Sequence, residues 1–433
     1  MLRVVAIAWL LATPLSAVAA DSITPGAQVG LADLVREALK ANPEIVQAEQ
    51  RVWMMRARVP QAGALPDPVL MSGVINEGRP VPFDTFGTAE FSEAYAGISQ
   101  GFPFPGKRGL REDIAQGEAD AERWAYEASR RRIIGEVATH YYELHAAREA
   151  VDLVQQHLAL VDRLAGVARE RFAVGQGTQQ DVLEAEVELS RLEERRSLLE
   201  QQRRMVEAAL ARLLDRSDAT VSGQLAPLVR TAIPSSAEDA FAQAEQASPL
   251  LQAQRLRVEA ASRRVDLSRR ERLPDFGVEL VYHDRGRRDL DPFYGIGATV
   301  TLPVYGSRKQ ERAIDEAQAE LRAARGALSG ARADLRYAVT SAHLQATTSE
   351  RLLRLYDEGL LEQARLVLDS AMAQYRVGKG DFSTVIASWR RLLDDELAYR
   401  QQLATHETAI ARLAIETGSL ALLPPAPLSE EER

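Results

Sequence analysis

The sequence predicts a mostly helical chain that also carries two pairs of membrane-type β-strands and is written as one unit twice. Three observations lead to this fold class. The same landmark residues recur about 200 positions apart and in the same order. Apolar residues at seven-residue steps run through long stretches that lack proline, which is typical of supercoiled helices. Apolar residues alternate with small or polar ones at one fixed place in each copy, which is typical of strands.

The internal repeat is clearest in two motifs. At an offset of 200, four residues of the stretch 97–108 recur: Gly97, Pro103, Gly106 and Arg108 match Gly297, Pro303, Gly306 and Arg308. At an offset of 203, the stretch 171–177 matches 374–380 in an aromatic residue, a valine and two glycines. A solenoid is disfavoured because it needs at least three shorter repeats. We expect a first repeat over 21–230 and a second over 231–417.

The two ends of the chain read differently from the repeats. Residues 1–20 are predicted to be a secretory signal peptide, because a lone Arg3 precedes a short apolar core and a small-residue end at Ala19 and Ala20. The apolar core is too short to span a bilayer. Residues 418–433, rich in proline and then in glutamate, are expected to form a flexible tail.

A strand hairpin is predicted at about 66–104 in the first copy and at about 275–304 in the second. In the last strand of the second hairpin, apolar residues alternate with glycine and threonine over nine positions. Such alternation suits a strand between lipid and a water-filled lumen. The residues expected to face lipid are Tyr294, Ile296, Ala298, Val300 and Leu302.

Four strands cannot close a barrel by themselves. An open strand edge in lipid leaves backbone groups unpaired, so several copies of the chain must share one barrel. Small barrels need at least eight strands, and a water-filled lumen needs more. The strand count therefore predicts an oligomer, although it does not fix the number of copies.

Long helices are predicted at about 106–173 and 178–214 in the first copy, and at about 306–376 and 381–417 in the second. One heptad series runs from Val137 through Leu144 and Leu158 to Phe172. At about 1.5 Å per residue, the first helix is on the order of 100 Å long. A soluble coiled-coil scaffold or periplasmic adaptor is the alternative, but it leaves the two strand hairpins unexplained.

Composition and motifs exclude several function classes. The sequence has 0 cysteines and a net charge of −9, which disfavours thiolate metal sites and nucleic-acid binding. The six histidines show no metal-ligand spacing, and Met54 and Met55 point about 100° apart on a helix. Motifs for acyl or phosphoryl transfer are absent from the sequence. We therefore expect no enzyme, no cofactor and no tight metal site.

Several landmarks together resemble the TolC-like outer-membrane efflux factors: Asn42-Pro43-Glu44, the stretch 61–68, the Pro/Gly strand exits and the two glycine turns. The resemblance covers nearly the whole mature chain. It implies a homotrimer in the outer membrane that extends into the periplasm. It also implies a twelve-stranded β-barrel, four strands per chain, on a twelve-helix α-barrel. Residues 215–238 and the tail would join an equatorial belt or hang loose, and without cysteine the chain would not be lipidated.

Within that family, the stretch 97–108 after Ala64-Leu65-Pro66-Asp67-Pro68 resembles the branch that works with heavy-metal cation pumps. This resemblance implies a passive conduit in a tripartite efflux system. Its partners would be a periplasmic membrane-fusion adaptor and an inner-membrane RND-type pump, with lipid around the barrel. Drug efflux or type I secretion by the same fold remains the alternative.

Two tight turns are the predicted functional site. They are expected to form the periplasmic tip that docks the adaptor, through Val174, Gly175, Gly177, Thr178, Val377, Gly378, Gly380 and Asp381. Ordinary hairpin turns would also explain these residues, since glycine supplies a positive φ and Thr178 or Asp381 can cap the next helix.

An acid near the tip is a second candidate. The resemblance implies that Asp181 latches the closed tip, although an acid in the first helical turn is also stabilised by the helix dipole. Relatives carry pore-facing acids where this sequence has Thr384 and Ala387. Asp381, or Asp394 and Asp395, could replace them, although a solvated face suits the latter pair better.

Overall fold

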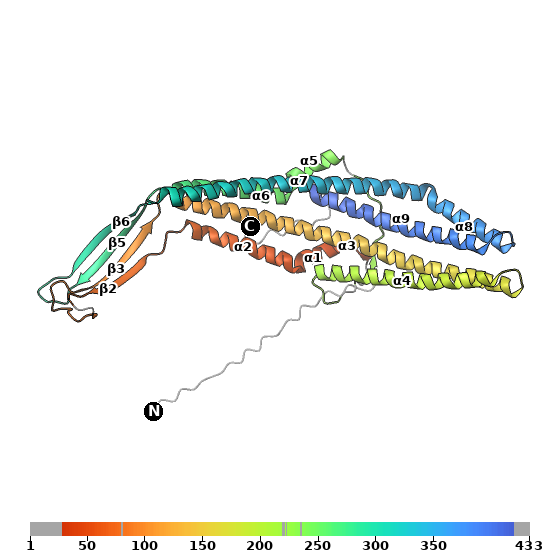
Figure 1. The fold of residues 1–433 in the computed structure, drawn as a ribbon, viewed down its shortest axis with the longest axis horizontal. Coiled ribbons are helices and arrows are strands. Elements are labelled where there is room, and N and C mark those ends of the chain that lie inside the picture. The colour runs from red at the N-terminus through yellow and green to blue at the C-terminus, as the bar shows by residue number, and fades with distance from the viewer. Residues whose placement is uncertain (1–27, 79–80, 219–220, 222, 234–235, 420–433) are drawn as a thin grey trace, which may run out of the picture.

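The computed structural model describes residues 28–419, except 79–80, 219–220, 222 and 234–235. The predicted signal peptide therefore lies outside the described residues, and so does the tail beyond residue 419. The chain is elongated, with a small sheet at one end and two helical turns at the other (Figure 1).

The four strands form one antiparallel sheet in the order β2-β3-β5-β6. They are β2 (Val69–Ile75), β3 (Glu93–Phe102), β5 (Asp275–Asp284) and β6 (Phe293–Thr301). Each copy contributes one hairpin, and the two hairpins join where β3 pairs with β5. In that central pairing Gly97 lies opposite Val281. β2 and β6 are left as the two outer edges of the described sheet.

Strand periodicity gives this sheet two unlike faces, because alternate residues point to opposite sides. One face, here called the apolar face, carries mostly exposed apolar side chains: Leu70, Ile98, Phe102, Phe276, Val278, Leu280, Tyr282, Tyr294, Ile296 and Val300. The other, here called the inner face, carries glycine and polar residues such as Glu93, Ser99, Glu279 and Thr299. It also carries a few exposed apolar residues, namely Val69, Ile75 and Phe293.

Beyond the end of the sheet, which lies at the left in Figure 1, four long helices lie side by side in one layer. They are α2 (Pro43–Gly63), α3 (Lys107–Ala173), α6 (Pro249–Arg270) and α7 (Glu311–Leu355), with contacts between α2 and α3, α3 and α6, and α6 and α7. Asn42 and Ser248 cap α2 and α6, and each is followed by proline at the first helical position, a residue pre-organised for that place. The predicted heptad series is buried at Val137, Leu144 and Leu158.

Toward the turns, α3 and α4 (Gln179–Leu213) form one hairpin, and α8 (Leu361–Arg376) and α9 (Phe382–Thr417) form the other. A shared core fills the space between the two hairpins, with Val154, Ala165, Leu368 and Trp389 among its buried residues. Phe172, expected to continue the heptad series, is 49% exposed because it lies in the last turn of α3, beyond this core.

The second copy departs from the single long helix expected over about 306–376. Two π-helical segments interrupt it, at Gly306–Gln310 before α7 and at Tyr356–Leu360 between α7 and α8. A π segment inserts one residue into the helical repeat and so rotates the buried stripe.

Short elements surround the middle of the helical layer. Helix α1 (Leu31–Ala41) contacts α3, and α5 (Ala237–Ala247) contacts α7 and α9. Strands β1 (Gln28–Val29) and β4 (Gln224–Leu225) pair in parallel and place Val29 and Leu225 in the core. These segments therefore form a belt partway along the rod.

The junction between sheet and helices is built on a buried lysine. Lys107, 1% exposed, donates from Nζ to the carbonyl oxygen of Leu273 at 2.8 Å and to Asp275 Oδ1 at 2.9 Å. Glu271 lies 3.3 Å from the same ammonium group. Since a buried charge is tolerated only when paired, this cluster fixes the junction.

Candidate functional site

The first turn joins α3 to α4 and is closed by its own residues. Gly175 adopts a φ of 72°, which glycine tolerates without strain. The backbone amides of Gln176 and Gly177 donate to the carbonyl oxygen of Arg171 at 2.8 and 3.1 Å. Thr178 caps α4 in a capping box, since its hydroxyl accepts from the Asp181 amide at 3.2 Å while Asp181 reaches back to the Thr178 amide.

The second turn, between α8 and α9, has the same backbone path and weaker side-chain support. Gly378 adopts a φ of 73°, and the Lys379 amide donates to the Gln374 carbonyl oxygen at 2.9 Å. Asp381 occupies the N-cap position of α9, but its side chain accepts no capping hydrogen bond. The predicted capping role is therefore met by Thr178 and not by Asp381.

Three side chains connect the two turns, although they belong to different repeats. The hydroxyl of Tyr375 donates to Asp181 Oδ2 at 3.0 Å. Arg171 donates to the carbonyl oxygen of Arg376 at 2.9 Å, and its guanidinium carbon lies 4.8 Å from the centre of the Tyr375 ring. Burial and the Asp181 carboxylate raise the pKa of Tyr375 to about 12, so this phenol stays a donor near neutral pH. We name this set, Arg171, Asp181 and Tyr375, the tip latch.

A second set of polar contacts connects the same two helical hairpins farther from the turns. Glu188, 3% exposed, accepts from Arg390 Nε at 2.9 Å, and Arg195 pairs with Asp394 at 2.8 Å. The Trp389 indole donates to His157 Nδ1 at 2.9 Å. Because an indole can only donate, His157 Nδ1 must accept.

The remaining predicted tip residues are displayed outward. Val174 and Val377 are each 68% exposed, so the two turns present a matched pair of valines to solvent. Thr384 and Ala387 are exposed, as is Asp381. Asp394 and Asp395 are tied to Arg195 and Arg391, at 2.8 and 3.9 Å.

The residues expected to face lipid share one side of β6. Tyr294, Ile296, Ala298, Val300 and Leu302 are all exposed, and Ile296 is 81% so. The four of them within β6 lie in register with apolar residues of β5, such as Leu280 opposite Ile296 and Phe276 opposite Val300. They therefore belong to a continuous apolar surface.

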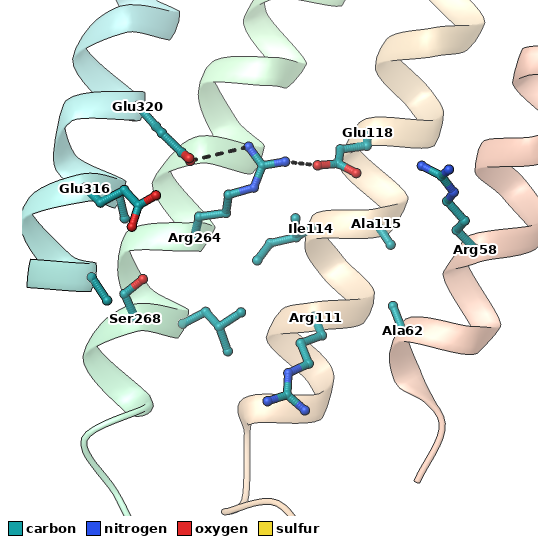
Figure 2. Close-up of a pocket in the computed structure, with 13 residues that line it drawn as sticks. Arg58, Ala62, Arg111, Ile114, Ala115, Glu118, Arg264, Ser268, Glu316 and Glu320 are labelled. Carbon is teal, nitrogen blue, oxygen red and sulfur yellow. Dashed lines mark hydrogen bonds and ion pairs between the residues drawn. The ribbon is translucent and has the colours of Figure 1, made fainter. Parts of the chain in front are cut away.

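A cavity of about 470 Å³ lies among the helices near the sheet. Residues of α2, α3, α6 and α7 line it, and Figure 2 shows Arg264 lying between Glu118 and Glu320. Arg111 is also paired, with Glu271 at 2.8 Å. These ion pairs cross-link the wall helices. Within the described part of the chain, no three histidine or acidic residues could hold a metal ion together.

Most of the contacts that connect the two turns could not be predicted from the sequence. Arg171 and Tyr375 lie within the turn motifs that mark the repeat, but side-chain pairing between copies has no spacing signal. His157 and Trp389, 232 residues apart, were equally hidden.

Comparison with known proteins agrees with this architecture. A family model described as outer membrane efflux protein matches residues 34–216 and 240–415, one match in each repeat. The pyoverdine export outer membrane protein OpmQ of Pseudomonas putida is 25% identical over 402 residues, which is 88% of this chain and 84% of OpmQ.

Two solved structures share the fold. The outer-membrane channel OprN has a TM-score of 0.78 at 16% identity, covering 90% of this chain and 89% of that one. CusC, described in terms of conformational changes that accompany folding and transmembrane channel formation, has a TM-score of 0.75 at 15% identity. The match covers 91% of this chain and 93% of CusC. The predicted TolC-like fold and internal repeat are therefore confirmed. The chain belongs to the outer membrane efflux protein family of the bacterial outer membrane.

Proposed function

We propose that this chain is one subunit of a homotrimeric outer-membrane channel that conducts substrates passively, without catalysing a reaction. In this assembly, three four-stranded sheets close a twelve-stranded barrel, and three helical layers close a twelve-helix tube. The observation that carries the proposal is the sheet itself. It has an exposed, mostly apolar face, an opposite and more polar face that carries the six strand glycines, and two free edges.

The unsatisfied edges of the chain support assembly. Helices α4 and α7–α8 lie at opposite sides of the molecule (Figure 1), and both expose apolar side chains. On one side these are Leu183, Val187, Leu198 and Met205; on the other they are Tyr337, Leu344, Leu366 and Val367. Helical spacing places such residues in stripes that suit burial against a neighbouring helix. Neighbouring copies would bury both stripes and pair β2 with β6.

The lipid contact follows from the apolar face. Its exposed residues would be costly in water and are favourable against hydrocarbon chains. Among the described helices, none is both long and apolar enough to cross a membrane. The inner face would then border the aqueous lumen.

The two turns are the proposed periplasmic tip. Val174 and Val377, with Gly175, Gly177, Gly378 and Gly380, would meet the hairpins of a periplasmic adaptor. The tip latch would hold the two hairpins of each subunit together at rest. Adaptor binding would favour an arrangement in which the latch is broken, which is a shift between existing states.

The proposed energy source is an inner-membrane RND-type pump, and the proposed substrates are heavy-metal cations. The stretch 97–108 supports the metal branch through its resemblance. Drug efflux or type I secretion by the same channel is the competing assignment, and OpmQ is an export protein for pyoverdine.

Two experiments test the channel and its substrate separately. Native mass and single-channel recording of detergent-purified protein test the channel: a trimer with stable conductance is expected, and a water-soluble monomer would overturn it. Growth of a deletion strain under metal or drug challenge tests the substrate. Sensitivity to metal cations is expected, and sensitivity to drugs alone would exclude the metal assignment.

A further inference from the structure

The glycines of the sheet are distributed unevenly between its faces. All six glycines of the four described strands lie on the inner face: Gly73, Gly97, Gly101, Gly277, Gly295 and Gly297. The apolar face has none. Glycine inside a strand weakens it and commonly marks a place where another group approaches closely. The described helices lie beyond the end of the sheet (Figure 1), so they do not supply that group.

The approaching groups are side chains of the neighbouring strand. Glu279 lies opposite Gly297 in the register of β5 and β6. A Cβ atom added to Gly297 would lie 2.7 Å from Glu279 Cγ, closer than real Cβ atoms come. The Glu279 side chain therefore occupies the space that a side chain at position 297 would need.

The same arrangement recurs at two other positions. Tyr95 lies opposite Gly73, and a Cβ on that glycine would be 2.7 Å from Tyr95 Cε1. Thr299 fills the space over Gly277 in the same way. Each of these side chains leans across the sheet over its glycine instead of standing upright. Gly97 differs, because a Cβ there would first meet backbone, the Leu280 carbonyl oxygen at 2.8 Å.

We propose that these glycines are sockets that keep the larger inner-face side chains flat against the barrel wall and thereby set the bore of the channel. Glu279 on Gly297 and Tyr95 on Gly73 are the two pairs with the largest side chains. This inference rests on the proposed function, because it requires the inner face to border the lumen. The size limit for exported substrates then depends on Gly73 and Gly297.

The decisive variant is Gly297→Val. The new side chain fills the socket, so Glu279 must stand up into the lumen, and three copies narrow the bore together. Gly295→Val is the matched control, since it adds the same volume to the same face of β6. A Cβ there meets only His283 Nε2, at an ordinary 3.7 Å, and the Val281 carbonyl oxygen at 3.9 Å.

Single-channel conductance of the trimers in planar bilayers is the measurement. We expect G297V to lose conductance relative to both wild type and G295V. The double variant E279A/G297V should recover it, because the displaced side chain is gone. Recording in 1 M salt screens the charge of Glu279, so that the bore is compared and not the electrostatics.

The possible outcomes separate the two proposals. Absence of conductance both in the wild type and in Arg171→Ala, which breaks the tip latch, would overturn the channel itself. A conducting wild type with equal losses in G297V and G295V, or without recovery in E279A/G297V, would overturn the socket model alone. If G297V does not assemble, the pair G73V and Y95A/G73V applies the same test at the other socket.

Discussion

The two helical turns share a backbone path but differ in what holds them. Each turn is closed by a backbone carbonyl oxygen of its own, that of Arg171 in the first and that of Gln374 in the second, but only the first adds a capping box, between Thr178 and Asp181. The second has Asp381 at its N-cap without a side-chain bond and Thr384 where the first has Asp181. Its support comes from the first turn, through Arg171 and Asp181.

This difference indicates that the two repeats have different roles at the turns. The first hairpin is a preformed unit, while the second depends on the tip latch for its position. If the tip opens, the second hairpin should therefore be the one that moves. Substitution of Arg171 or Asp181 should therefore loosen the second turn more than substitutions in the second turn loosen the first.

The largest effect is expected for Arg171→Ala. It removes hydrogen bonds to the carbonyl oxygens of Arg376 and Gln176, at 2.9 and 2.8 Å, together with the contact on the Tyr375 ring. We expect a local loss of about 2 kcal/mol, hence roughly thirtyfold faster amide exchange in the second turn. Hydrogen exchange read by mass spectrometry over 377–384 checks this, with higher resting conductance as a second readout.

Arg169→Ala is the matched control for that prediction. Arg169 forms an exposed pair with Glu186 at 3.4 Å, of the kind that contributes about 0–1 kcal/mol. Equal exchange rates in the second turn of R169A and R171A would contradict the dependence of the second turn on the first.

The second prediction concerns alkaline pH. The Tyr375 phenol donates to Asp181 only while protonated, and its pKa is raised from 10.0 to about 12 by burial and by that carboxylate. Its contribution to stability is complete below pH 10 and is lost as the pH rises through about 12. Tyrosinate absorbance of wild type minus Tyr375→Phe should show one group titrating near pH 12. A difference titration centred near pH 10 would argue against the latch.

A smaller effect is expected for Thr178→Ala. The capping box is lost, and with it about 1 kcal/mol of stability at the start of α4. Amide exchange should accelerate over 179–182 and change little in the second turn, where Asp181 still accepts from Tyr375. Thr178→Ser, which keeps the hydroxyl, should restore the wild-type rates.

The smallest effect is expected for Asp381→Ala. Since the Asp381 side chain makes no capping bond, its removal should change local stability by less than about 0.5 kcal/mol. Exchange rates over 382–385 should therefore match the wild type. A loss as large as that of T178A would mean that both turns are capped alike, and the comparison would fail.

Much of this architecture was readable from the sequence because it rests on periodicity. Alternation over 294–302 identified β6 and its exposed side, and seven-residue spacing identified the buried side of α3 at Val137 and Leu144. The glycine turns were located because a positive φ at Gly175 and Gly378 leaves a residue-type signature.

What the sequence did not predict depends on contacts between the two copies. Tyr375 of α8 and Asp181 of α4 are 194 residues apart, and their bond exists only because the two helical hairpins pack on one shared core. The π segment at Tyr356–Leu360 has no compositional mark either. Asp381 was assigned a possible cap from its residue type, whereas side-chain orientation decides whether the bond forms.

The Lys107 cluster determines how motion at the helical turns is transmitted to the sheet. An ammonium group clamped by Leu273, Asp275 and Glu271 leaves the strand-to-helix joint little freedom to pivot. In a trimer, three such junctions would form a rigid ring between the helical part of the channel and the membrane. Motion that begins at the helical turns should then stop at these junctions. The outer opening of the β-barrel would keep the same diameter whether the periplasmic tip is closed or open.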